Sequence, residues 1–289
     1  MNHNTSIKAL RSTPMPQRIA RLPRDRRGYP IIATLRRDGQ GNADFRMVDA
    51  DRRFIVAAFD WCGICGLPFG DERRFVLYEP HPARRVDPIS HTESSVHEIC
   101  AYYALAVCPF LMSPKATVKQ GPAAGMGNEN LVLAGYRNLL GVLDDPNGPC
   151  IVLSNCEVRT ALDREKNTER YLELLAGERP LRLSQTFTEL LEWFEEPDPI
   201  GILVAAIAET SYSATVHVPP VWDHLRDAGQ VLAMCSDFEL ESIPGAQDLS
   251  LVRRWLAECG EDNLPPLVAG SILDAQGFYA AVGGPTPRR

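Results

Sequence analysis

The chain has 289 residues, 45% of them hydrophobic and 23% charged, with a formal net charge of −7. This length fits one large or two ordinary domains, and the composition is typical of a globular protein. No apolar run approaches the ~20 residues that a membrane helix needs, and the N-terminus lacks the apolar stretch of a secretory signal. Eight cysteines without such a signal predict a reducing, cytoplasmic compartment, where thiols stay free or bind metal.

The net charge is divided unevenly along the chain. Residues 1–125 contain 18 Lys and Arg against 12 Asp and Glu, a net of +6, which leaves 12 against 25, a net of −13, for residues 126–289. A basic half of this kind favours contact with an anion, most simply nucleic acid. Contact between the basic and acidic halves explains the same division equally well. Both interpretations stay open.

The first half predicts a tail followed by a domain of short strands. Residues 1–28 are rich in Arg and Pro and predict a flexible basic tail. Residues 29–112 predict a zinc-binding domain. Its expected elements are strands at Tyr29–Leu35, Phe45–Val48, Phe54–Ala58 and Phe75–Tyr78, a Pro-rich loop at 79–92, and a helix from Ser94 to Val107 that ends before Pro109.

The second half predicts an acidic α/β domain at residues 131–289, after a linker. Residues 113–130 carry Gly and Pro without apolar periodicity, and they lack the Gly-Lys-Ser/Thr that a phosphate-binding loop requires. The expected elements are a strand at Cys150–Ser154, a helix at Thr168–Ala176, a helix opened by the capping box Thr186–Glu189, a buried strand at Ile200–Ala208, a helix from Pro219 to Asp227, a strand at Val231–Met234 and a helix from Asp248 to Cys259.

Four residues have the spacing of metal ligands. Cys62 and Cys65 form a C-x-x-C pair on a tight turn, and His97 and Cys100 lie at i and i+3, on one face of a helix. Two such pairs of soft ligands are the set that a tetrahedral zinc ion takes. The order of knuckle, extended stretch and helix predicts a treble-clef zinc module. Buried thiols without metal and a catalytic metal are the alternatives, and Cys108 either approaches the metal or faces the core.

Other polar residues offer weaker candidates for a catalytic site. His81 sits where an HNH nuclease has its general base, but the middle Asn of that motif is missing and four protein ligands would close the metal site. Asp87 and His91 share the Pro-rich loop with His81, and solvated surface explains all three as well. A Ser, His and Asp stretch around His217 lacks the nucleophile elbow of a hydrolase. The arginine pairs at 36–37, 73–74 and 84–85 could contact phosphates.

Residues 20–115, roughly, resemble a family of short hypothetical proteins of bacteria and phages. The motifs that carry the resemblance are LPRDRRGYP at 22–30, ADFR at 43–46, CGICG at 62–66, the strand beginning Phe75-Val76, His97-x-x-Cys100, and CPFL at 108–111. The resemblance implies zinc binding through Cys62, Cys65, His97 and Cys100, and no established activity. Relatives tend to have a Cys near the position of His81, which makes His81 an alternative ligand.

The sequence as a whole predicts a two-domain α+β protein, in which a treble-clef-like zinc domain precedes an α/β domain. The expected function is a zinc-stabilised binding module for nucleic acid or a protein partner, with an acidic regulatory or interaction domain. The alternative is an enzyme whose site lies in the second domain or between the two. A polar pocket lined by His81, His91 or His217 would favour the enzyme.

Overall fold

The computed structural model describes residues 9–37, 42–80, 87–91, 93–108, 110–111, 130–144, 150–195, 247–259 and 272–274, and both helices and strands occur in them. Among these described residues, no helix has the length and apolar character to cross a membrane. The predicted elements at 200–208, 219–227 and 231–234 lie outside them.

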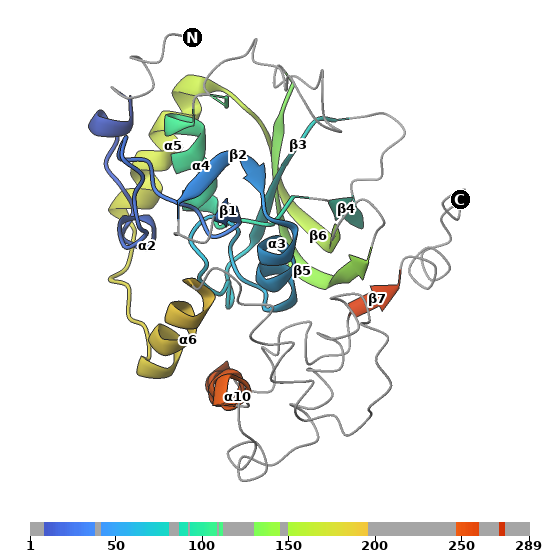
Figure 1. The fold of residues 1–289 in the computed structure, drawn as a ribbon. Helices are drawn as coiled ribbons and strands as arrows, with labels where there is room; N and C mark the ends of the chain where they lie inside the picture. The colour runs from blue at the N-terminus through green and yellow to red at the C-terminus, as the bar shows by residue number, and fades with distance from the viewer. Residues whose placement is uncertain are drawn as a thin grey trace.

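A five-stranded sheet of order β3-β5-β6-β4 forms the centre of the described fold, and β7 pairs with β5 beside that path (Figure 1). Its strands are β3 (Arg74–Tyr78), β4 (Ile89–His91), β5 (Val132–Asp144), β6 (Cys150–Ala161) and β7 (Ile272–Asp274). All neighbours are antiparallel except β7, which runs parallel to the end of β5. A separate antiparallel hairpin joins β1 (Leu35–Arg37) and β2 (Ala43–Val48).

The longest strand, β5, was not predicted. Its ladder with β6 shifts register between Gly135 and Tyr136 and again between Leu139 and Gly141. The first shift leaves Glu157 of β6 as the extra residue, and the second leaves Leu140 of β5 as the extra residue, so the alternation that marks a strand is broken once in each strand. Gly135 is required by packing, because a Cβ at this position would lie 2.7 Å from the ring of Phe75 on β3.

The central sheet contains strands from both sides of the predicted linker at 113–130. β3 and β4 precede this segment, β5 and β6 follow it, and the two sets pair with each other. Buried residues from both halves also belong to one hydrophobic cluster. The division into a zinc domain and an acidic α/β domain is therefore not confirmed, and the described residues share one core.

Residues 9–28, predicted as part of a flexible tail, instead pack against this core. Leu10, Ile19 and Leu22 are buried, and Ile19 lies on the short helix α2 (Gln17–Ala20). The hydroxyl of Tyr171 donates a hydrogen bond to the carbonyl of Pro14 and ties this segment to a helix of the second half. A few well-spaced apolar side chains anchor the segment, although its composition is dominated by Arg and Pro.

The expected strand at Phe54–Ala58 is wrong, because these residues end the helix α3 (Ala50–Ala58). Asp49 caps it, since the Asp49 carboxylate accepts a hydrogen bond from the backbone N–H of Arg52 at 3.0 Å. Arg52, Ile55 and Val56 are buried, which is the i, i+3, i+4 spacing of a helix face. The continuous apolar run at residues 54–58 is equally typical of a buried strand, which is why a strand was predicted.

The expected strand at Tyr29–Leu35 is also wrong, because the strand β1 begins only at Leu35 and runs to Arg37. The preceding backbone supports the predicted zinc knuckle instead of pairing with another strand. The N–H of Ala33 donates to the carbonyl of Ile64 at 2.9 Å, and the N–H of Thr34 donates to that of Gly63 at 3.3 Å.

The remaining helices pack in two pairs. α4 (Glu98–Val107) contacts α5 (Arg164–Ala176), and α6 (Gln185–Glu195) contacts α10 (Gln247–Cys259), as Figure 1 shows. α10 begins one residue before the predicted Asp248, and the starts of the other three helices also differ from the prediction. α4 starts at Glu98 with His97 as its N-cap, α5 starts four residues before Thr168, and α6 is capped by Ser184, whose hydroxyl oxygen accepts from the N–H of Phe187 at 3.0 Å.

An aromatic cluster fixes the second helix pair to the residues around Cys62. Trp61 is 1% exposed, and its ring meets those of Phe187, Phe194 and Trp255 edge to face, at centroid distances of 5.5, 5.6 and 5.5 Å. Such contacts add to the burial of the rings themselves. Helices from the second half therefore hold in place the turn that begins at Cys62.

Candidate metal centre

Residues Cys62–Gly66 form a tight turn that presents two thiols. The N–H of Gly66 donates to the carbonyl of Cys62, and the N–H of Cys62 donates to that of Leu67, both at 2.8 Å. Gly66 has φ +69°, which an L side chain rarely adopts. Gly63 has no room for a side chain, because a Cβ would lie 2.5 Å from that of Ser94. These two glycines allow the turn to close against the segment that leads into α4.

Helix α4 brings the other two residues of the cluster. His97 is the N-cap and Cys100 lies in the first turn, so the two side chains point the same way, toward the Cys62–Gly66 turn. The segment before the helix is fixed on both sides. Val96 forms a bridge with Phe75 of β3, and the N–H of Gly63 donates to the carbonyl of Ser95 at 2.9 Å.

The four predicted ligands lie together and are fully buried. One ligand atom from each of Cys62, Cys65, His97 and Cys100 falls within 4.8 Å of all the others, and each residue is 0% exposed. The Cys65 Sγ to His97 Nδ1 distance is 3.4 Å. Bond lengths of ~2.3 Å to sulfur and ~2.0 Å to nitrogen place these two atoms about 3.5 Å apart around a tetrahedral ion. The cluster therefore has the size and ligand chemistry to hold one metal ion.

The imidazole of His97 is oriented by a hydrogen bond to the backbone that was not predicted from the sequence. Its Nε2 lies 3.2 Å from the carbonyl oxygen of Pro68 and donates to it, so Nδ1 is the ring nitrogen that faces the thiols and would bind the metal. Phe69 packs against the imidazole with centroids 4.6 Å apart. The sequence signal for this contact is the position of Pro68, three residues beyond Cys65. The backbone that follows the C-x-x-C turn lies close to both ligand pairs, so one of its carbonyl groups can accept a hydrogen bond from the histidine.

Two further polar groups surround the thiols. The backbone N–H of His97 donates to Cys62 Sγ at 3.4 Å, as the free N–H groups at a helix N-terminus do for anions. The guanidinium of Arg21 donates to the carbonyl of Cys65 and so holds the turn from outside. A site of three cysteines and one histidine carries a net negative charge around a divalent ion, and these donors are placed to stabilise it.

The titration of the cluster follows from its burial and its crowding. Burial alone would raise the pKa of the Cys62 thiol, but hydrogen bonds from Cys100 and Cys65 hold that pKa well below its usual range. Burial raises the pKa of Cys65 and raises that of Cys100 well above its ordinary value. Burial would lower the pKa of His97, yet the charges of Cys62 and Cys65 raise it well above normal. A bound cation would stabilise all three thiolates together.

The other predicted candidates that the structure describes do not join this cluster. Cys108 is half-buried just beyond α4 and is not one of the four clustered residues. His91 is buried on β4, where Nε2 lies 3.1 Å from the carbonyl of Leu77 and Nδ1 accepts from the N–H of Glu93 at 3.0 Å. Asp87 accepts from the N–H groups of Asn155 and Cys156 at 3.0 and 2.9 Å. His81 and His217 lie outside the described residues.

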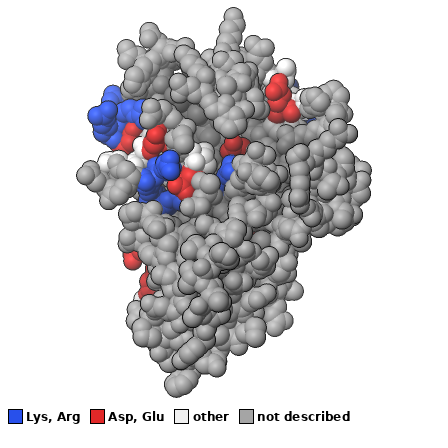
Figure 2. Space-filling view, turned by 45° about the vertical axis from the view of Figure 1, so that its right-hand side comes forward, with Lys and Arg blue, Asp and Glu red and all other residues white. Residues whose placement is uncertain are grey.

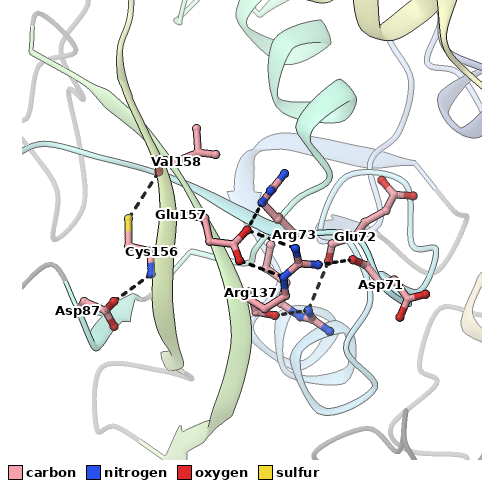
Figure 3. A network of polar contacts seen from close by, with 9 residues as sticks. Asp71, Glu72, Arg73, Asp87, Arg137, Cys156, Glu157 and Val158 are labelled. Atoms are coloured by element: carbon pink, nitrogen blue, oxygen red, sulfur yellow. Dashed lines mark hydrogen bonds and ion pairs between the residues drawn. The ribbon is translucent and has the colours of Figure 1, made fainter.

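Ion pairs connect the basic half of the chain to the acidic half. Glu157 on β6 pairs with Arg73 and with Arg137, the latter at 3.2 Å, as Figure 3 shows. Arg18 pairs with Glu178 at 3.9 Å as well as with Glu72. Glu98 on α4 pairs with Arg170 on α5 at 2.9 Å. Arg73–Glu157 and Arg18–Glu178 join a base of the basic half to an acid of the acidic half, so contact between the halves accounts for part of the charge division. Glu98–Arg170 joins the two halves with the charges reversed.

Paired charges also mark the described surface. On the face drawn in Figure 2, described Lys and Arg side chains lie beside Asp and Glu side chains. Arg74 belongs to the predicted arginine pair at 73–74, and its guanidinium binds Asp60 and the carbonyl of Arg137. Both members of that pair are thus engaged within the protein. The pair at 84–85 lies outside the described residues.

Comparison with known proteins adds no relative to these observations: no family model, no curated protein and no solved structure matches the chain.

Proposed function

We propose that Cys62, Cys65, His97 and Cys100 bind one structural zinc ion and that the protein is a zinc-stabilised binding module for nucleic acid or a protein partner. The observation that carries the proposal is the complete burial of all four ligands, each 0% exposed. A catalytic zinc keeps one coordination position open to water or substrate, whereas four buried protein ligands fill a tetrahedral site. The metal then stabilises the fold, and the binding function belongs to the protein surface around the metal centre.

Zinc is favoured over other ions by the ligand set. Three thiolates and one imidazole are soft ligands, and a tetrahedral arrangement of such ligands suits zinc. The order of knuckle, β3 and α4 is also that of a treble-clef-like module, which is the fold we propose for this part. The resemblance of residues 20–115 to the bacterial and phage zinc-binding family implies the same four ligands. Reduced thiolates agree with our proposal of a cytoplasmic location.

The positive charge of the N-terminal segment favours an anionic partner. The segment 9–37 contains eight Arg and a single acid, Asp25. Arg18 and Arg21 are used inside the protein, by Glu72 and by the carbonyl of Cys65. Arg27 pairs with Asp25, whereas Arg24 and Arg26 form no ion pair with a carboxylate of the described residues and leave positive charge for an anionic partner. We propose that the acidic half both docks on the basic half and limits which anions it accepts.

The test uses the full-length protein purified with its metal. Metal analysis should give one zinc per chain, and the metal-loaded protein should bind a labelled nucleic acid, with an affinity that falls as salt rises. Absence of any bound metal would overturn the structural-zinc proposal. Absence of nucleic-acid binding at low salt would leave a protein partner. Turnover of a substrate that is lost on mutation of His91 or His217 would instead favour the enzyme.

A further inference from the structure

A cavity of ≈ 690 Å³ lies between residues 23–27 and the start of β2, apart from the metal centre. Its size is within the range of pockets that hold small ligands or parts of larger ones, ~300–1,000 Å³. Three of its lining residues are arginines, Arg24, Arg26 and Arg27, and Phe45 contributes an aromatic ring. The sequence predicted a tail at residues 1–28 and a strand at Phe45–Val48 here, and no function.

The turn that forms one wall is closed by its own hydrogen bonds. The carboxylate of Asp25 accepts from the N–H groups of Arg27 and Tyr29, both at 2.9 Å, and from Arg27 Nε at 2.6 Å. The N–H of Asp25 also donates to the carbonyl of Tyr29 at 3.0 Å. Gly28 has φ +90°, which allows the chain to reverse inside this loop. The wall is therefore built before any ligand arrives.

Two of the three arginines have no carboxylate partner and are available to bind an anionic ligand. Within the described residues, no carboxylate lies at ion-pair distance from Arg24 or Arg26, whereas Arg27 is paired with Asp25. Arg24 Nη2 donates to the sulfur of Met15 at 3.3 Å, a weak acceptor that leaves the charge of the guanidinium uncompensated. Asp44 is the other acid that lines the cavity, and it has an interaction partner of its own. Three Arg and two Asp give the lining a formal charge of +1, and the positive excess sits on Arg24 and Arg26. Unpaired guanidinium groups are good phosphate ligands.

The aromatic ring supplies a second kind of contact. Phe45 is 37% exposed, and the guanidinium of Arg27 lies 5.0 Å from its centroid. Tyr29 supports Phe45 edge to face at 6.2 Å. An exposed aromatic ring beside guanidinium groups is the combination on which unpaired bases stack while their phosphates are held by Arg. A duplex hides its base faces, so this combination selects a single strand.

We propose that this cavity binds single-stranded nucleic acid, with one base stacked on Phe45 beside Arg27 and backbone phosphates bound by Arg24 and Arg26. The inference rests on the proposed function, of which it specifies the nucleic-acid partner.

Arg26→Ala and Phe45→Ala in the full-length, metal-loaded protein test the two contacts separately. Among the described residues Arg26 makes no hydrogen bond or ion pair and is exposed, so its loss should leave the fold intact. Arg11→Ala is the control for charge, because Arg11 is an exposed arginine of the same segment that does not line the cavity. Leu140→Ala is the control for an exposed apolar side chain, since Leu140 is 44% exposed on β5. Metal content and circular dichroism check that each variant is folded.

Binding is measured by fluorescence anisotropy with a labelled 12-nucleotide single strand and a duplex of the same sequence, over a series of salt concentrations. We expect tighter binding of the single strand. Phe45→Ala should weaken it about fivefold to a hundredfold, the usual effect of losing one base–aromatic stack. Arg26→Ala should reduce the slope of log affinity against log salt by about 0.7, the value for one phosphate contact on a single strand. Both controls should bind as the wild type does.

Three outcomes would overturn the inference, and they separate it from the proposed function. If the protein binds nucleic acid but both cavity variants match their controls, another surface binds and the proposed function stands. Equal or tighter binding of the duplex would remove the single-strand preference. If the wild type binds neither probe at low salt, the inference fails and the proposed function is left with a protein partner.

Discussion

Arg52 and Phe194 are 142 residues apart in the chain and are joined by a buried hydrogen bond, in which Arg52 Nη1 donates to the carbonyl of Phe194 at 2.9 Å. The guanidinium also lies 5.0 Å from the centroid of the Phe194 ring. Arg52 is 2% exposed, although it belongs to the basic half and sits on α3. This contact ties α3 to the end of α6 and makes the helix pair α6–α10 part of the same body as the metal centre.

Arg52→Ala should lower the free energy of unfolding by about 1.5–3 kcal/mol, because it removes a charge-assisted hydrogen bond and leaves a carbonyl without this donor. Urea unfolding followed by circular dichroism measures the change. Arg11→Ala removes an exposed arginine of the same half and should change stability by less than about 0.5 kcal/mol. Equal effects of the two substitutions would show that the buried contact adds nothing.

Cleavage within residues 113–130 should leave the two fragments associated. Five residue pairs connect β3 to β5 and three connect β4 to β6, and these pairs join strands from opposite sides of the cut. After limited proteolysis, size-exclusion chromatography in native buffer should give one peak that contains both fragments by mass spectrometry. Separation into two folded fragments would instead support the two-domain division predicted from the sequence.

Cys65→Ala should remove the metal and destabilise the fold, because in a buried site the free energy of metal binding contributes to folding. Metal content and thermal unfolding measure both effects, and chelation of the wild-type protein should reproduce them. Cys108→Ala is the matched control, since Cys108 lies near the same helix but outside the cluster. This control should keep one zinc per chain. A stable, metal-free wild-type protein would contradict the prediction.

Asp25→Asn should make stability less sensitive to acid. Burial would raise the pKa of Asp25, but the hydrogen bond from Arg27 and those from the backbone lower it. A carboxylate with a depressed folded pKa stabilises the protein above its unfolded value of about 3.9, and this stabilisation is lost as pH falls through the lower folded pKa. Unfolding by urea at a series of pH values from 6 to 3 should show a shallower decline for the variant. Parallel curves for variant and wild type would show that Asp25 does not contribute.

The metal ligands could be predicted from the sequence because their chemistry is local. Cys62 and Cys65 share one turn, and His97 and Cys100 share one helical turn, so spacing alone places each pair. The meeting of the two pairs in a buried cluster agrees with the expected set, and the identity of the ion stays a proposal. The contact of His97 with Pro68 and the support of Arg21 depend on how separate segments pack, which the spacing does not contain.

Several elements were decided by tertiary packing instead. β5 has no clean alternation, because the extra residue Leu140 exchanges its faces, and its pairing with β3 and β6 on either side identifies it as a strand. Residues 9–28 look like a tail in composition, yet Leu10, Ile19 and Leu22 find a core made by other segments. Composition and periodicity thus determined the charge division, the ligand pairs and most helices, since these depend on neighbours in the chain. The shared sheet, the buried Arg52 and the cavity beside Phe45 depend on residues distant in sequence, and only the folded chain brings them together.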